Sequence, residues 1–112
     1  MSASEIGLIE LEPETVKAML DSGEAVLVDV REEEEFAEDH IHGSLLSPMS
    51  DFEVEAWPSI PGKKVIISCL GGVRSAAVAR KLIASGQGWA IHLRGGGVGV
   101  SHGGLLLQVF TH

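Results

Sequence analysis

Residues 65–75 read Val65-Ile66-Ile67-Ser68-Cys69-Leu70-Gly71-Gly72-Val73-Arg74-Ser75. A short β-branched run ends at Cys69, the only cysteine of the chain, and a helix-forming stretch follows from Ala76 to Ala84. The pattern predicts a strand, a tight loop and a helix, with the thiol at the start of the loop. A helix N-terminus presents unpaired N–H groups and a partial positive charge, which lower the pKa of a thiol held there. Cys69 is therefore a candidate nucleophile in a nest of backbone amides.

Strands and helices alternate along the chain on both sides of this unit. Residues 25–30 are almost continuously apolar, which is typical of a strand buried on both faces of a parallel sheet. Further strands are expected at residues 6–11, 45–47 and 90–93 (the last strand), and helices at residues 13–20 and 31–39. The pattern predicts an α/β fold, a small mostly parallel sheet of about five strands with helices on both faces.

The same topology predicts where a ligand binds. In open parallel sheets the ligand site lies beyond the carboxyl ends of the strands. Cys69 follows one predicted strand, and Asp29 and Arg31 stand at the end of another. We expect these residues to lie at one edge of the sheet.

Length, charge and cysteine content narrow the class of protein. The 112 residues, 45% of them hydrophobic, predict a single domain over residues 1–112. The formal net charge of −8 argues against a nucleic-acid partner and against an anionic membrane surface. A lone cysteine suits a reducing compartment, and neither a signal peptide nor an apolar run long enough to span a bilayer is recognisable. We therefore expect a cytoplasmic protein.

Two polar segments have ordinary interpretations. The acidic run Glu32 to Glu35 is expected to be a solvated face, with Glu35 close enough to Arg31 for an ion pair. The pair His40 and His42 has no partner cysteines, so no metal site is expected. Residues 94–104 hold six glycines, which disfavour a helix but leave helix and loop both open.

With these residues in view, the chain resembles the single-domain rhodaneses, a family of sulfurtransferases. The segment Val28-Asp29-Val30-Arg31, followed by Glu35-Phe36, His40-Ile41 and Gly43, resembles the family's D-V-R, E-F, H-I-x-G pattern. The stretch from Cys69 to Ser75 resembles its active-site loop C-x-x-G-x-R-S, and Leu93-Arg94-Gly95-Gly96 resembles its L-x-G-G segment. The resemblance covers about residues 6–107.

The resemblance implies transfer of a sulfane sulfur through a persulfide on Cys69. A small donor such as thiosulfate would load the sulfur, and cyanide, a thiol or a protein acceptor would remove it, without a metal or organic cofactor. Asp29 and Arg31 would support the site rather than react. The residues implied for the substrate-binding loop are Leu70, Gly71, Gly72, Val73, Arg74 and Ser75. The oligomeric state is not implied.

The chain departs from the family at several positions. His42, Gly97, Val100 and Leu106 stand where the family often has proline, an apolar residue, an aromatic residue and proline, which makes the last helix uncertain. Leu70 and Val73 are apolar where rhodaneses that prefer thiosulfate tend to carry cations, so thiosulfate is not expected to be the physiological donor.

Two other functions compete with sulfur transfer. Phosphatases and arsenate reductases on this fold use Cys-x5-Arg, whereas here only Leu70 to Val73 separate Cys69 from Arg74. The shorter loop suits a single sulfur atom better than a tetrahedral oxyanion. The other alternative is a non-catalytic module that binds a protein partner, which the retained cysteine disfavours.

Overall fold

The computed structural model describes residues 6–94 and 109–111. The strands are β1 (Leu8–Leu11), β2 (Ala25–Asp29), β3 (Asp39–Ile41), β4 (Leu45–Leu46), β5 (Lys64–Ser68), β6 (Ala90–Leu93) and β7 (Val109–Thr111). The helices are α1 (Pro13–Asp21), α2 (Glu33–Glu38) and α3 (Val73–Leu82), with 3-10 turns at Met49–Asp51 and Val54–Ala56 and a π-turn at Ile83–Gln87.

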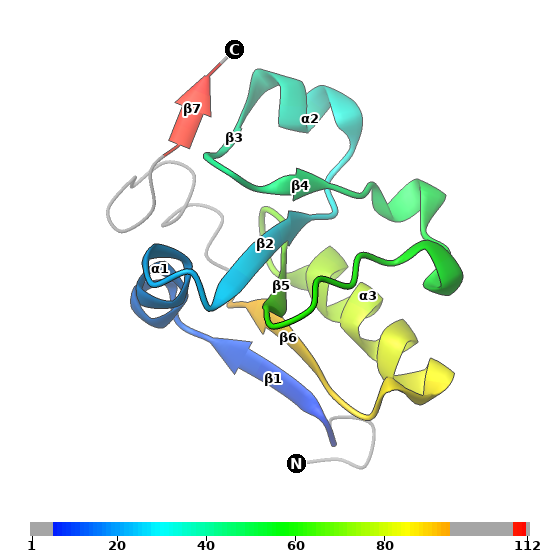
Figure 1. The fold of residues 1–112 in the computed structure, drawn as a ribbon. Helices are drawn as coiled ribbons and strands as arrows, with labels where there is room; N and C mark the ends of the chain where they lie inside the picture. Colours follow the sequence, from blue (N-terminus) through cyan, green and yellow to red (C-terminus); the bar gives the residue numbers. More distant parts are fainter. Residues whose placement is uncertain (1–5, 95–108, 112) are drawn as a thin grey trace.

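A parallel sheet forms the centre of the fold (Figure 1). In the described part of the chain it has five strands in the order β1-β6-β5-β2-β4, and every neighbouring pair runs parallel. β2 lies between β4 and β5, and only Val26 among its residues is not fully buried. The predicted fold class and the doubly buried strand are thus confirmed.

Helices cover both faces of this sheet, as the sequence predicts. Leu27 packs with Val16 of α1, while the next residue of the strand, Val28, packs with Val78 of α3. Successive side chains of a strand point to opposite faces, so each strand contributes to two separate apolar layers. Figure 1 shows α1 and α3 on opposite sides of the sheet.

The helix predicted after Cys69 is present and begins at Val73, because Gly72 occupies the N-cap position. Two other predictions about helices and strands are wrong. α2 begins at Glu33 rather than Arg31, since the backbone N–H of Arg31 donates to the Asp29 carboxylate at 2.9 Å instead of opening a helix. β6 is also not the last strand, because β7 pairs antiparallel with β3.

Part of the carboxyl-terminal prediction cannot be compared with the structure. The glycine-rich stretch from residue 95 onward, with Gly97, Val100 and Leu106, lies outside the described residues. Within residues 6–94 and 109–111, no helix is both long and apolar enough to cross a membrane.

Candidate active site

The sulfur of Cys69 lies in a cradle made by the loop that follows β5. The backbone N–H of Gly72 donates to Sγ at 3.0 Å, and that of Ser75 donates at 3.2 Å. The Cys69 thiol lies 3.5 Å from the hydroxyl of Ser75, to which it donates. N–H donors aimed at one sulfur favour a negative charge on it. The predicted amide nest is present, and its donors come from Gly72 and Ser75.

Gly72 makes the tight curl of this loop possible. Its φ of 88° lies in the left-handed region, which a side chain disfavours, and it occupies the N-cap position of α3. The turn directs the first N–H groups of α3 back toward the end of β5. The sulfur therefore sits at the positive end of a ten-residue helix.

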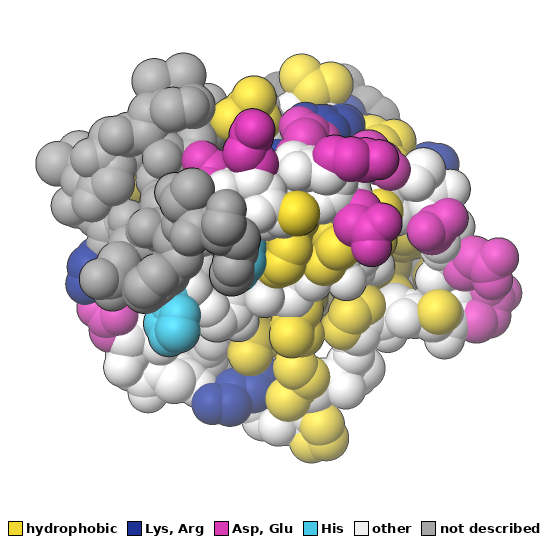
Figure 2. Space-filling model, turned by 90° about the horizontal axis from the view of Figure 1, so that it is seen from above, with side chains coloured by type: hydrophobic (Ala, Val, Ile, Leu, Met, Phe, Trp, Pro, Cys, Tyr) yellow, Lys and Arg dark blue, Asp and Glu magenta, His cyan; other side chains and the backbone are white. Residues whose placement is uncertain are grey.

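The outer side of the loop is apolar and open to solvent. Leu70 is 39% exposed and Val73 is 78% exposed. On the face that Figure 2 shows, acidic and hydrophobic side chains are exposed side by side. The exposed side chains of Leu70 and Val73 therefore give this side of the loop an apolar surface without a positive charge.

Arg74 is fixed by α2. Its guanidinium donates to the carboxylate of Glu35 at 2.7 and 3.1 Å, a bidentate pair that joins the loop to a helix far away in sequence. The hydrogen bond from Arg74 lowers the pKa of Glu35 from 4.5 to about 2. The same bond raises the pKa of Arg74, to which a negative charge on Cys69 also contributes. The sequence did not reveal this partner, because nothing local links two residues so far apart.

The acidic run is therefore only partly a solvated face. Glu33 and Glu34 are exposed, as expected, but Glu32 and Glu35 form a capping box at the start of α2. Glu32 also accepts a hydrogen bond from the hydroxyl of Ser50 at 2.6 Å. Glu35 uses its carboxylate for Arg74 rather than for the expected ion pair with Arg31.

Asp29 and Arg31 form a buried ion pair at the end of β2. The Arg31 side chain donates to both carboxylate oxygens of Asp29 at 2.9–3.1 Å and to the backbone carbonyl of Asp39 at 2.7 Å. Burial alone would lower the pKa of Arg31, but the bond to Asp29 and the charge of Asp39 raise it. The pair fastens the end of β2 to β3. The supporting role of the pair in the site stays a prediction.

Sequence reasoning missed a second polar element, beneath the cradle. The hydroxyl of Ser75 lies 3.0 Å from Nδ1 of His92, a residue of β6 that is only 3% exposed. The Nε2 atom of His92 lies 3.6 Å from the carboxylate of Glu10 on β1. A histidine inside the apolar strand Ala90–Leu93 was the available signal.

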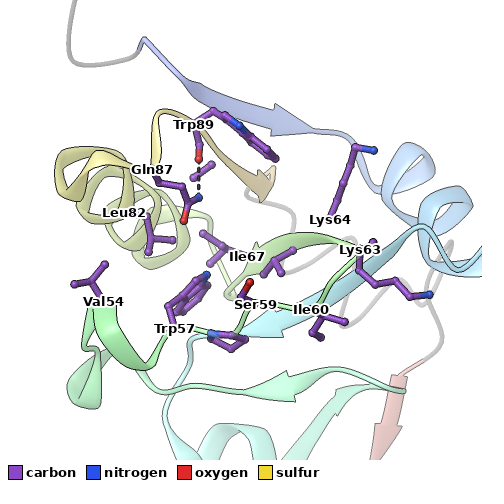
Figure 3. A pocket seen from close by; sticks show the side chains of 14 residues that line it. Val54, Trp57, Ser59, Ile60, Lys63, Lys64, Ile67, Leu82, Gln87 and Trp89 are labelled. Carbon is purple, nitrogen blue, oxygen red and sulfur yellow. Dashed lines mark hydrogen bonds between the residues drawn. The ribbon is translucent and has the colours of Figure 1, made fainter.

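A large hollow lies away from this site (Figure 3). It has a volume of about 630 Å³ and is lined by Trp57, Trp89, Leu82 and the first residues of β5 and β6. These residues mark the amino ends of the two strands, whereas Cys69 follows the carboxyl end of β5. The hollow is thus at the opposite end of β5 from Cys69, whereas ligand sites in parallel sheets lie beyond the carboxyl ends of the strands.

Residues 6–94 and 109–111 contain no cluster of three or more His, Cys, Asp or Glu side chains suited to holding a metal ion. The groups gathered at Cys69 are a thiol, a hydroxyl and backbone amides, which suit covalent chemistry at sulfur.

Comparison with known proteins identifies relatives of this arrangement. An uncharacterised protein of Synechocystis is 30% identical over 96 residues, which cover 86% of this chain and 54% of that protein. A tRNA uridine(34) hydroxylase of Enterobacter is 32% identical over 101 residues, which cover 85% of this chain and 29% of the hydroxylase. The chain thus spans about half the length of the first relative and less than a third of the second.

Solved structures give a similar picture. A thiosulfate sulfurtransferase from Pseudomonas aeruginosa superposes with a TM-score of 0.75 at 29% identity, over 93% of this chain and 20% of that one. A Rhodopseudomonas palustris protein described as a possible tyrosine phosphatase superposes with a TM-score of 0.66 at 27% identity, over 83% of this chain and 79% of that one.

The match to a family model includes the site. Residues 12–102 match the model of the Rhodanese-like domain, which includes the Asp29–Arg31 pair, the whole cradle and His92. The resemblance noted from the sequence is thereby confirmed, and the chain belongs to the rhodanese-like domain family.

Proposed function

We propose that this protein is a sulfurtransferase that moves a sulfane sulfur from a small donor to a cyanide, thiol or protein acceptor through a persulfide on Cys69. The observation that carries the proposal is the cradle: N–H groups of Gly72 and Ser75 lie 3.0 and 3.2 Å from Sγ. Such donors stabilise the thiolate that attacks and the thiolate that is released. The family match and the similarity to a thiosulfate sulfurtransferase support the same reaction.

The reaction needs two displacements at sulfur. The Cys69 thiolate attacks the outer sulfur of a donor such as thiosulfate, a new S–S bond forms, and sulfite leaves with the electron pair of the broken S–S bond. An acceptor then attacks the outer sulfur of the persulfide, and Sγ leaves again as a thiolate. Cyanide as acceptor gives thiocyanate. Neither step requires a metal or an organic cofactor, and no metal is proposed.

The donor is expected to carry less charge than thiosulfate. Leu70 and Val73 stand exposed at the rim without a positive charge, and the chain carries a net charge of −8. A dianion is repelled by such a surface, whereas an organic persulfide carries at most one negative charge and its organic group can contact the apolar side chains. Thiosulfate is thus proposed as a donor that works at high concentration.

Phosphate chemistry is the alternative that a structural neighbour suggests. A phosphatase loop needs an arginine to bind the phosphoryl oxygens, but Arg74 is engaged in a bidentate pair with Glu35. Only Leu70 to Val73 separate Cys69 from Arg74, which leaves a short loop for a tetrahedral group. These observations favour sulfur over phosphate.

Intact mass spectrometry tests the proposal. Incubation with thiosulfate or with an organic persulfide, which lose sulfite and a thiolate respectively, is expected to add one sulfur atom, and cyanide is expected to remove it as thiocyanate. Cys69→Ser and wild-type protein blocked with iodoacetamide serve as matched controls, and both should stay unloaded. The proposal fails if no sulfane donor produces an adduct. Hydrolysis of aryl phosphates that depends on Cys69 would support the phosphatase instead.

A further inference from the structure

A line of buried polar groups runs from the sulfur through the interior of the protein. Ser75 is fully buried, and His92 is 3% exposed. The Cys69 thiol donates to Ser75 Oγ at 3.5 Å, and Oγ lies 3.0 Å from His92 Nδ1. Ile67 of β5 is paired with His92, and it packs with Val78 of α3 in the apolar layer on this face of the sheet.

The line continues to the surface at the edge of the sheet. β1 is an edge strand, and Glu10 stands directly opposite His92 in the pairing of β1 with β6. The Glu10 carboxylate lies 3.6 Å from His92 Nε2 and is 51% exposed. The sulfur, hydroxyl, imidazole and carboxylate thus connect the active site to solvent on the β1 side.

The hydroxyl of Ser75 has one hydrogen and more than one hydrogen-bond acceptor within reach. It donates to the carbonyl of Gly72 at 3.2 Å or to His92 Nδ1 at 3.0 Å, depending on the state of the imidazole. When Nδ1 carries no proton, Ser75 donates to it and accepts from the Cys69 thiol. When Nδ1 is protonated, Nδ1–H donates to Ser75, whose hydrogen then turns to Gly72 or to the Cys69 sulfur.

We propose that Ser75 and His92 take up the proton of the Cys69 thiol when the nucleophile forms. The S–H bond breaks, the proton joins Ser75 Oγ, and the hydroxyl hydrogen of Ser75 passes to His92 Nδ1. The products are a Cys69 thiolate, an unchanged Ser75 hydroxyl and an imidazolium paired with Glu10. His92 and Ser75 are positioning residues that act through Cys69, and this inference rests on the proposed sulfur transfer for its use.

The surroundings of His92 suit this task. β1 presents the Glu10 carboxylate, α3 presents Ser75, and β5 presents the apolar side chain of Ile67 at the position paired with His92. Cys69 faces the imidazole through Ser75, while Arg74 of the same helix is turned to Glu35. A carboxylate near Nε2 stabilises an imidazolium electrostatically, although water at the half-exposed Glu10 weakens the attraction.

The rate of alkylation by iodoacetamide tests this proton relay, by which we mean the transfer from Cys69 through Ser75 to His92. The thiolate is the form that reacts, and Cys69 is the only cysteine in the sequence. The profile of rate against pH is measured for wild type, His92→Asn and His42→Asn. Asparagine keeps a hydrogen-bonding atom near the position of Nδ1 but does not titrate in this range. His42 is exposed and serves as the matched histidine control.

Wild type and His42→Asn are expected to show two inflections, because the proposed proton transfer makes the rate depend on the protonation of the imidazole as well as on that of the thiol. His92→Asn should show one inflection and about tenfold slower alkylation at pH 7. A tenfold change in rate corresponds to a displacement of the profile by roughly one pH unit. Circular dichroism and thermal unfolding confirm that the variant is folded. A folded His92→Asn with the wild-type profile would overturn the proposal.

Other variants keep the test decisive if His92→Asn does not fold. Glu10→Gln changes an exposed edge residue, and it should slow alkylation at pH 7 by about threefold, a smaller effect than loss of the imidazole because the charge is partly screened. Ser75→Ala should remove the second inflection, and Ser75→Thr should restore it. An unchanged profile in Glu10→Gln and Ser75→Ala would refute the relay. Iodoacetamide needs no sulfur donor, so a failure of sulfur loading in wild type would reject the proposed function and leave the relay result standing.

Discussion

The Arg74–Glu35 pair leads to the sharpest stability prediction. Glu35→Gln removes the charge of Glu35 and leaves the shape of the side chain nearly intact. Glutamine also still reaches back to the N-cap of α2, as a capping box allows. The substitution therefore isolates the electrostatic contact between α2 and the cysteine loop.

The structure sets the size of the effect. The pKa of Glu35 falls from 4.5 to about 2, which at about 1.4 kcal/mol per unit gives an upper limit of roughly 3 kcal/mol. The side chains of Arg74 and Glu35 are 33% and 35% exposed, so water screens the pair. We expect Glu35→Gln to lower the free energy of unfolding at pH 7 by about 1 kcal/mol, or Tm by roughly 4 °C.

The pH dependence follows from the direction of the shift. A folded-state pKa below the unfolded one means that stabilisation is fully present above pH 4.5 and is lost as the pH falls toward 2. Urea unfolding of wild type and Glu35→Gln should therefore differ by about 1 kcal/mol at pH 7 and converge near pH 2.

Glu34→Gln is the matched control, because it makes the same charge change on an exposed position of the same helix. It should change the unfolding free energy by less than about 0.5 kcal/mol. Equal stability of Glu35→Gln and Glu34→Gln at pH 7 would refute the reasoning. A difference in unfolding free energy between wild type and Glu35→Gln that is as large at pH 2 as at pH 7 would refute it as well.

Three further substitutions probe the support of the site and the core. Asp29→Asn leaves the buried Arg31 with only the more distant carboxylate of Asp39 as a countercharge, and it is expected to destabilise the protein by about 3 kcal/mol in urea unfolding. A change below about 1 kcal/mol would contradict the importance of the buried pair. Gly72→Ala forces a side chain into a φ of 88°, so it should cost about 1–2 kcal/mol and slow alkylation of Cys69, whereas unchanged stability and rate would count against the cradle. Leu27→Ala creates a cavity at a residue that is 2% exposed, and calorimetry should show a loss of about 3 kcal/mol.

The sequence was sufficient for the features that depend on local pattern. The apolar run of β2 indicated a strand buried on both faces, and the Cys69 loop with its glycines indicated a turn onto a helix. Both readings use only neighbouring residues and the periodicity of the chain. The site residues at the ends of β2 and β5 met at one edge because parallel strands align their carboxyl ends.

The features that were missed depend on contacts between distant segments. Glu35 looked like one of several similar acids, and only the fold brings it, rather than Glu34, to Arg74. In the sequence His92 was one polar residue in an apolar strand, and only the structure shows its contact with Ser75 of α3. β7 was missed because a strand of three residues is too short to show a pattern in the sequence and is recognised by its pairing with β3.

The positions of the two tryptophans determine what intrinsic fluorescence can measure in this protein. The chain has two tryptophans and no tyrosine, and both indoles line the hollow at the amino ends of β5 and β6. Ultraviolet emission therefore originates at the end of the sheet away from the Cys69 loop. Loading or blocking the sulfur should leave the spectrum nearly unchanged, while unfolding should alter it strongly. Fluorescence thus supplies a folding signal that stays independent of the chemical state of the thiol.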